Sequence, residues 1–212
     1  TAYHFVYCIF CDWYLEFAKP LFNSDDAVAK AETRATTAWA RDQILKLLHP
    51  FMPFITEELW AKTAETPRET LLLVAPWDDF DGFAEDIAAS TEITWVIDLI
   101  KGIRSRRAEM NVPAGAKIPL VLNGASEESA ARLAKHIDVI ATLARLSSAE
   151  AAPQIPKGSA QFVLGEAVVA LPLGDVIDFA RERQRLEKDL KKAEDEIARF
   201  DAKLGNEQFV AK

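Results

Sequence analysis

Hydrophobic residues recur at helical spacing through the first half of this chain of 212 residues. In residues 2–19 aromatic and aliphatic side chains occupy nearly every face, which predicts a buried helix that Pro20 ends. Ser24, followed by two aspartates, predicts the N-cap of a second helix that runs to about Leu48. Later elements are expected as a short helix at 56–64, an extended stretch at 71–77 and a long helix at 84–109. The first half should therefore be a helical bundle.

From Val112 onward the pattern changes. Residues 118–122 lean toward a strand, and the spacing predicts a single helix over 127–145. Two short apolar runs at 161–164 and 167–171 flank Gly165-Glu166, which predicts a hairpin with glycine first in its two-residue loop. We expect a small mixed α/β unit at 112–174.

The last segment carries the clearest periodicity, because apolar residues alternate between the a and d positions of a heptad with Arg183 as the polar exception. These seam residues are Phe179, Leu186, Leu190, Ala193, Ile197, Phe200 and Leu204. The pattern predicts one long coiled-coil helix of roughly 39 Å. Its seam needs a partner, either a second helix outside this sequence or another chain.

Composition narrows the class of protein. With 50% hydrophobic and 27% charged residues the chain is expected to be globular. The lack of a run of about 18 apolar residues argues against a membrane span. Two cysteines without a disulfide framework fit the cytoplasm. The chain starts at Thr1 without a signal-peptide pattern, so we expect an internal piece of a longer protein.

Charge is distributed unevenly along the chain. The net charge of −8 argues against indiscriminate coating of nucleic acid. Residues 1–85 hold 7 basic and 14 acidic residues, whereas residues 176–212 hold 9 of each. The basic charge therefore gathers toward the C-terminal half.

Two arginines of the helix at 84–109 continue its aliphatic stripe when residues are placed at 100° intervals. Arg104 and Arg107 lie on the stripe, Lys101 flanks it and Arg106 points away. A guanidinium on such a stripe needs a partner, because an unpaired buried cation is costly. Two interpretations stay open: pairing with carboxylates of the acidic bundle, or contact with a phosphate or base.

The terminal helix separates its charges by heptad position. Basic residues occupy the b, c and f positions opposite the seam: Arg181, Arg185, Lys188, Lys191, Lys192 and Arg199. Acidic residues flank the seam at e and g, and Asp195 is the acid on the basic side. The segregation predicts a ridge that binds a polyanion. The alternative is a solvated face of mixed charge.

No motif for catalysis, cofactors or metals rises above background. The sequence holds no phosphate-binding glycine loop, dinucleotide fingerprint or metalloprotease motif. Cys8 and Cys11 lack a second ligand pair, so we expect them to pack as small hydrophobic residues. We therefore predict no catalytic, cofactor-binding or metal-binding residue in this chain.

Several motifs lie in order along the whole chain. They are residues 10–16 with Lys19, 47–60, 75–77, 107–113, 156–158, 171–173, 185–188, 206–207 and 209–211. Together they closely resemble the C-terminal region of the valyl-tRNA synthetases. The run Arg107-Ala108-Glu109-Met110-Asn111-Val112 followed by the heptads is the most particular to that family.

The resemblance implies a mainly α fold. It implies a class I synthetase-type anticodon-binding helical bundle at 1–111, a small α/β connector at 112–174 and, at 175–212, the first helix of a truncated coiled-coil hairpin that binds tRNA. Valine tRNA and the remainder of the synthetase chain are the implied partners, and ATP with magnesium serves the parent enzyme. The signature motifs of catalysis and the editing domain lie upstream in that family, so this piece should be inactive alone.

The residues and the resemblance suggest the same mechanism, in which cations of the helix and of the arm contact RNA phosphates. An alternative function is a coiled-coil interaction module that pairs through the seam and binds no nucleic acid. Charge segregation on the terminal helix favours RNA. Seam burial also predicts non-native pairing of the truncated arm between two copies.

Overall fold

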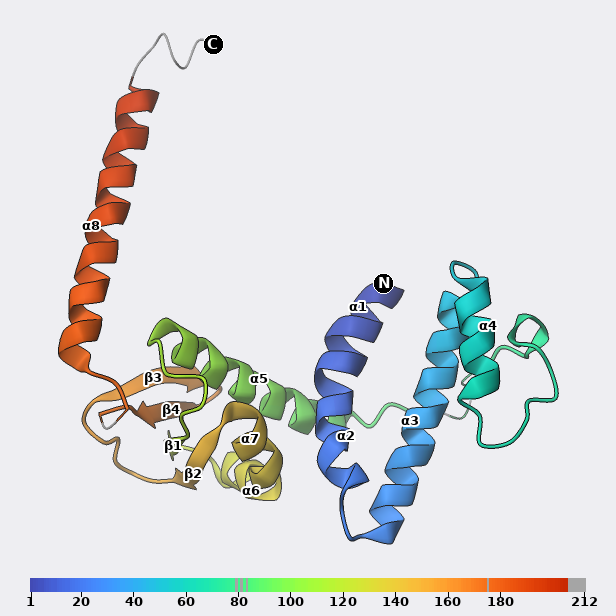
Figure 1. The fold of residues 1–212 in the computed structure, drawn as a ribbon. Helices are drawn as coiled ribbons and strands as arrows, with labels where there is room; N and C mark the ends of the chain where they lie inside the picture. Colours follow the sequence, from blue (N-terminus) through green and yellow to red (C-terminus); the bar gives the residue numbers. More distant parts are fainter. Residues whose placement is uncertain (79, 81, 83, 175, 206–212) are drawn as a thin grey trace. The chain divides into compact units, whose positions relative to one another are not determined.

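The computed structural model describes residues 1–212 except 79, 81, 83, 175 and 206–212, and at 179, 181 and 182 it describes the backbone alone. The chain packs as two compact units, which we call unit 1 (Thr1–Thr91) and unit 2 (Glu92–Lys212). Figure 1 shows that unit 1 is helical and that unit 2 combines helices with a four-stranded sheet. A mainly helical fold with one small sheet confirms the expected fold class at that level.

The N-terminal segment is less buried than its composition predicts. It comprises α1 (Ala2–His4), the π-helix η1 (Phe5–Tyr14) and α2 (Leu15–Phe22). The helix that packs on it is α3, and Tyr3 and Tyr7 are exposed while Ala18 is buried. The prediction of a helix buried on every side is therefore wrong. Pro20 also lies inside α2 rather than ending it, because its carbonyl still accepts the N–H of Asn23 in a closing turn (3.2 Å).

The next two helices of unit 1 begin at other residues than predicted. They are α3 (Ala27–Leu48) and α4 (Pro53–Lys62). Asp26, not Ser24, caps α3, because its carboxylate accepts two backbone N–H groups at 3.0 Å. Helix α4 begins at Pro53, whose missing N–H costs nothing in a first turn. Thr56, predicted as its start, is buried inside it.

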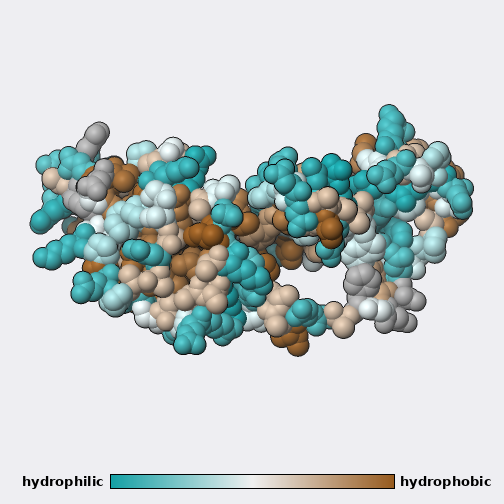
Figure 2. Space-filling model, turned by 90° about the horizontal axis from the view of Figure 1, so that it is seen from below, coloured by the Kyte–Doolittle hydropathy of each residue, from teal (hydrophilic) through white to brown (hydrophobic). Residues whose placement is uncertain are grey.

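The core of unit 1 lies between α3, α4 and the segment that follows them. Leu45, Trp60 and Leu72 are buried together, and the Trp60 indole N–H donates to the carbonyl of Thr70 (3.1 Å). The turn η2 (Leu72–Val74) replaces the extended stretch predicted at 71–77. Glu57 holds this turn by accepting the N–H of Leu72 (2.6 Å). Elsewhere apolar side chains lie exposed among hydrophilic ones, as Figure 2 shows for one face.

Unit 2 is built on a sheet with the order β2-β1-β4-β3. The strands are β1 (Ile118–Asn123), β2 (Leu146–Ala151), β3 (Ser159–Leu164) and β4 (Ala167–Pro172). The central strands β1 and β4 pair antiparallel and are mostly buried. Helix α5 (Ile87–Glu109), which enters unit 2 at Glu92, buries Val96, Ile100 and Ile103, as its spacing predicts.

The chain between β1 and β2 forms two helices instead of one. They are α6 (Glu127–Lys135) and α7 (Ile137–Ala144), and they connect two parallel strands. The prediction of one helix over 127–145 is wrong because the chain bends at His136, whose Nε2 lies 2.5 Å from Oε1 of Glu92. The sequence pattern also misses β2, an edge strand with few apolar residues that pairing with β1 organises.

The predicted hairpin and the predicted terminal helix are both confirmed. Strands β3 and β4 pair antiparallel around Gly165, whose φ of +59° favours glycine. Helix α8 (Phe179–Leu204) covers the heptad segment. The motif residues at 206–207 and 209–211 lie outside the described part of the chain. No helix among the described residues is long and apolar enough to span a membrane.

The predicted domain boundaries after residues 111 and 174 remain predictions. The packing divides the chain between Thr91 and Glu92, inside α5. This division follows from contacts, whereas the predicted one follows from the change in sequence pattern at Val112.

Gly102 lets α5 approach strand β3 closely. A methyl group at this position would lie 2.2 Å from Cε2 of Phe162, so the ring would have to move. Gly102→Ala should therefore lose about 1–3 kcal/mol through overpacking and regain about 1 kcal/mol of helix propensity. We expect a net loss of stability, measured by urea titration.

The same substitution in a Phe162→Leu background is the control. The smaller side chain relieves the clash, so Gly102→Ala should there be neutral or stabilising. An equal loss in both backgrounds would contradict the close contact.

Glu166 ties the β3–β4 hairpin to the start of α6. Its Oε1 accepts the hydroxyls of Ser129 and Ser126 at 2.7 Å each, and the N–H of Ser126 at 3.2 Å. The Ser129 hydroxyl, then the Ser126 hydroxyl and backbone N–H groups, lower the pKa of Glu166 from 4.5 to about 2. The carboxylate is therefore the form that the fold stabilises.

Because the folded pKa lies below the unfolded one, this contribution is complete above about pH 4.5 and is lost as the pH falls toward 2. Glu166→Gln should lower the thermal midpoint by a few degrees at neutral pH and by less at about pH 3. Thermal unfolding followed by circular dichroism measures the midpoint at each pH. Glu150→Gln, at an exposed position of β2, is the control. A loss that does not change with pH would refute the role of the carboxylate.

Candidate nucleic-acid interface

Helix α8 is exposed along nearly its whole length. Every residue from Leu186 to Leu204 is exposed, so the helix meets little of the rest of unit 2 beyond its first turns. The seam shows this most clearly, since Leu190 and Ile197 are each 60% exposed. The helix therefore offers one apolar side and one charged side to other molecules.

The charged side carries what we call the basic ridge: Lys188, Lys191, Lys192 and Arg199. All four side chains are exposed. Lys188, Lys191 and Arg199 make no ion pair with any described residue, and Lys192 lies 3.9 Å from Asp189 while it stays 68% exposed. Uncompensated exposed cations in a row suit the phosphates of a polyanion.

Two predicted ridge residues stand apart from these four. The side chain of Arg181 lies outside the described part of the chain. Arg185 is 40% exposed, pairs with Asp189 at 2.9 Å and donates through Nη2 to the carbonyl of Glu109 at 3.3 Å. Arg185 is therefore engaged with the end of α5.

The arginines on the stripe of α5 bond backbone carbonyls. Arg104 donates through Nε and Nη2 to the carbonyl of Leu143, at 3.1 and 3.0 Å. It remains exposed at the surface of unit 2. Because the carbonyl lies in the last turn of α7, the guanidinium also meets the negative end of that helix.

Arg107 is buried and takes three carbonyl partners. Its guanidinium donates to Ala116 at 2.8 Å, to Pro113 at 3.2 Å and to Arg145 at 3.4 Å. Burial, and then the charge of Arg145, lower the pKa of Arg107. Of the two interpretations left open for Arg107, the pairing with carboxylates of the bundle is not found, because neutral backbone oxygens take that place.

The remaining predicted cations of α5 lie at the surface. Arg106 pairs with Glu109 at 2.5 Å, and Lys101 lies 3.9 Å from Asp98. The Ser105 hydroxyl, then Arg106, lower the pKa of Glu109. Lys101, Arg104 and Arg106 thus form a second exposed cationic group, which local acids partly compensate.

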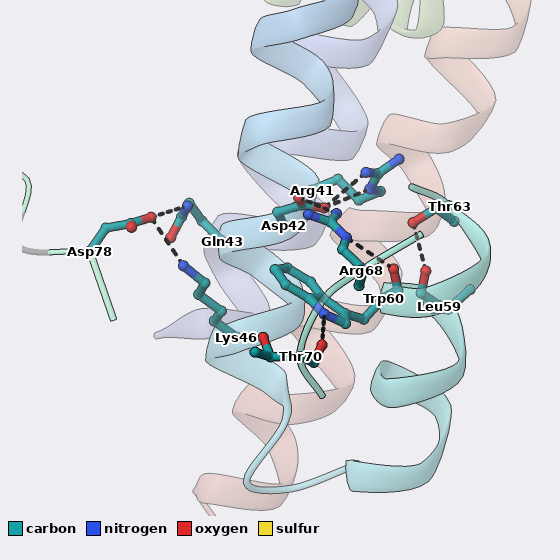
Figure 3. Close-up of polar contacts among 10 residues, drawn as sticks. All are labelled: Arg41, Asp42, Gln43, Lys46, Leu59, Trp60, Thr63, Arg68, Thr70 and Asp78. Atoms are coloured by element: carbon teal, nitrogen blue, oxygen red, sulfur yellow. Dashed lines mark hydrogen bonds and ion pairs between the residues drawn. The ribbon is translucent and has the colours of Figure 1, made fainter. Parts of the chain in front are cut away.

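Unit 1 holds a polar cluster that the sequence pattern does not reveal. Asp42 accepts Nε and Nη2 of Arg41 at 3.1 and 2.9 Å, and its other oxygen accepts Nη2 of Arg68 at 2.5 Å. The Arg68 guanidinium lies 3.8 Å from the centre of the Trp60 ring. Figure 3 shows it above the indole and beside Asp42. The cluster fastens the segment after α4 to α3.

A groove of about 670 Å³ opens beside this cluster. Its walls include Arg34, Arg41 and Arg68, with small residues of α3 between them. Arg34 is exposed and makes no ion pair among the described residues. Asp42 and Glu65 also line it, so the groove holds a small excess of positive charge within an acidic region. The seven-residue spacing of Arg34 and Arg41 is the signal that could have indicated it.

Cys8 and Cys11 are free thiols and are half-buried. Among the residues that the structure describes, no group of three or more His, Cys, Asp or Glu side chains is placed to hold a metal ion. The candidate interface consists of cations, and its arrangement suits the binding of an anion rather than catalysis.

Two known protein families match this chain, one over its N-terminal part and one over its C-terminal end. A family model described as "Anticodon-binding domain of tRNA ligase" matches residues 1–122. A second, described as "Valyl tRNA synthetase tRNA binding arm", matches residues 178–212. The second match includes α8 and its basic ridge.

The curated relatives are similar along the whole chain. Valine–tRNA ligases of Caulobacter vibrioides and Rhizobium meliloti are each 54% identical over 100% of this chain and over 24% and 22% of their own lengths. The valine–tRNA ligase of Brucella suis is 51% identical over 100% of this chain and 23% of its length. The chain thus spans about a quarter of these relatives, and the predicted resemblance is confirmed.

Arg107→Met should destabilise unit 2. The substitution keeps bulk but removes the guanidinium from three carbonyls, of which those of Pro113 and Arg145 keep a backbone N–H, at a cost of about 1–3 kcal/mol. Arg106→Met, one residue earlier, removes only an exposed ion pair worth about 0–1 kcal/mol. Urea titration of both variants measures the difference, and equal effects would contradict the structural role of Arg107.

Proposed function

Because this chain belongs to the family of anticodon-binding domains of tRNA ligases, we propose that it is the tRNA-binding portion of a valine–tRNA ligase. The helices of its N-terminal part hold the anticodon stem-loop. Helix α8, in the segment that matches the tRNA-binding arm, contacts the outer corner of the tRNA. Because the similar proteins are valine–tRNA ligases, the amino acid in this proposal is valine.

The exposed basic ridge is the observation that carries this proposal. Four cations and one acid, Asp195, lie along the side of this exposed helix opposite the seam. Each phosphate that such a cation neutralises releases a condensed counterion, which drives association. Lys101, Arg104 and Arg106 add contacts near the end of α5. Arg107 and Arg185 support the fold instead, since each is bonded to carbonyls within unit 2.

The exposed seam supports a coiled-coil arm. We propose that a second helix of the full-length protein packs on Leu186, Leu190 and Ile197 and completes a hairpin. Pairing of two copies through this seam remains a prediction, and it is the alternative function in which no RNA is bound. Binding of tRNA requires the basic ridge, whereas pairing of two copies requires only the seam.

In unit 1, unstacked anticodon bases need aromatic or polar surfaces, and their phosphates need cations. The groove beside Arg34, Arg41 and Arg68 offers the cations. We propose that it receives the backbone of the anticodon loop.

The complete enzyme, in this proposal, joins valine to its tRNA with ATP and magnesium in the cytoplasm. The present chain contributes recognition and no catalytic group, so it should neither activate valine nor charge tRNA by itself. Its task is to hold the tRNA while other parts of the enzyme act on the acceptor end.

Reversing the ridge should weaken tRNA binding. The triple variant Lys188→Glu, Lys191→Glu, Lys192→Glu removes three phosphate contacts, so the affinity should fall at least tenfold at about 0.1 M salt and the slope of log K against log salt should decrease by about two to three units. Fluorescence titration with valine tRNA at several salt concentrations measures both. Lys117→Glu with Lys157→Glu, which reverses exposed lysines outside the ridge, is the control.

A non-cognate tRNA in the same titration separates two roles. Weaker binding of the non-cognate tRNA places anticodon reading in this chain, whereas equal binding leaves it a general electrostatic role. Unchanged affinity of the triple variant would rule out the ridge and favour the interaction module.

A further inference from the structure

The guanidinium of Arg185 joins the root of α8 to the chain that leaves α5. The side-chain amide of Asn111 faces it, and the orientation that satisfies both groups turns the amide oxygen toward Arg185, where it accepts from Nε at 2.8 Å and from Nη2 at 3.0 Å. Nη2 also donates to the carbonyl of Glu109 at 3.3 Å, and Nη1 pairs with Asp189 one turn further along α8 at 2.9 Å. Asp189 therefore orients the arginine, and Asn111 receives it.

Asn111 lies in the turn formed by residues 109–113 after α5, which we call the corner, and backbone hydrogen bonds hold this turn. Asn111 adopts φ +49°, the left-handed conformation that asparagine tolerates better than most residues. Its N–H donates to the carbonyl of Ala108 at 3.1 Å, and the N–H of Val112 donates to the carbonyl of Arg107 at 2.9 Å. Arg107 in turn is held by its three carbonyl partners. The acceptor for Arg185 is thus fixed to the framework of unit 2.

Among the described side chains, apolar packing at the root of α8 is sparse. A cavity of about 470 Å³ lies there, lined by Met110, Pro113, Val176 and Ile177 together with Asn111, Asp178 and Arg185. From Leu186 outward the helix is exposed. Because an open cavity offers few dispersion contacts, the packing there does little to fix the direction of α8. Among the side chains that the structure describes there, Arg185 therefore supplies strong, charge-assisted bonds between the helix and residues 109–111.

The bond to Asn111 also sets how α8 is rotated about its axis. At about 100° per residue, the seam centres about 100° away from Arg185, while Lys192 and Arg199 lie within about 40° of it. Fixing Arg185 against the corner consequently fixes the directions in which the seam and much of the basic ridge face.

We propose that Arg185 and Asn111 form a latch that sets the direction and rotation of the tRNA-binding arm. Arg185 is then a positioning residue and not a phosphate contact, although it belongs by heptad position to the basic side. The effect on RNA rests on the proposed function, whereas the latch itself does not.

Distances between spin labels test the latch directly. Labels at Ser147→Cys in β2 and Ala198→Cys in α8, both exposed sites, report the direction of the arm in a background with Cys8→Ser and Cys11→Ser. The unaltered latch should give one narrow distance distribution. Arg185→Gln and Asn111→Gly should each broaden it about twofold, because one set of charge-assisted bonds is lost.

The choice of glycine at 111 separates the side chain from the backbone. Glycine keeps the left-handed conformation without strain and removes only the amide. Asn111→Asp, which retains the acceptor, should restore the narrow distribution. Arg183→Gln is the matched control, since Arg183 pairs with Glu187 on its own helix at 2.9 Å. A distribution that stays narrow in Arg185→Gln and Asn111→Gly would overturn the latch.

Titration with valine tRNA distinguishes positioning from phosphate contact. Asn111→Gly changes no charge, so a weaker affinity of about tenfold with an unchanged salt slope would show that position matters. A silent Asn111→Gly, with a slope about one unit smaller in Arg185→Gln, would overturn the proposal in favour of a phosphate contact. If the protein binds no tRNA at all, the proposed function fails, and the label distances still decide the latch.

Discussion

One buried cation organises the part of unit 2 from which the arm extends. Arg107 donates to carbonyls at Pro113, Ala116 and Arg145, and so joins the end of α5 to the connector before β1 and to the residue between α7 and β2. Burying a guanidinium without partners is costly, so these segments must be in place together. The corner at Asn111 inherits its geometry from that requirement, and the root of α8 depends on the corner.

Arginines and lysines therefore serve two purposes in this chain, and burial decides which. Arg107 is enclosed, and Arg185 bonds Asp189 on α8 as well as Glu109 and Asn111 at the end of α5. The ridge lysines Lys188, Lys191 and Lys192 are exposed, and Lys192 lies near a neighbouring acid, Asp189. The first kind provides a rigid support, and the second provides charge for RNA. An arm that carries phosphate-binding cations is useful only if its direction is defined, so the two kinds depend on each other.

Unit 1 shows that net charge is a poor guide to local potential. Its sequence is strongly acidic, yet Asp42 brings Arg41 and Arg68 together beside Arg34. Stacking on Trp60 and the ion pair with Asp42 together keep the Arg68 cation in place. An acidic protein can in this way attract an anionic partner at chosen places and repel it elsewhere.

The sequence by itself determined the elements whose pattern is local. Heptad spacing located α8, the three-and-four spacing identified the buried side of α5, and Gly165 marked the hairpin. It also identified the family, because long motifs keep their order. Only the tertiary structure decided that Pro20 lies inside a helix, that the chain bends at His136 and that polar β2 joins the sheet. It also supplied the partners of Arg107 and Arg185, which are backbone carbonyls and Asn111. Periodicity reports which side of an element faces inward, whereas the partner of a charged group is set by segments far away in sequence, whose positions no local pattern encodes.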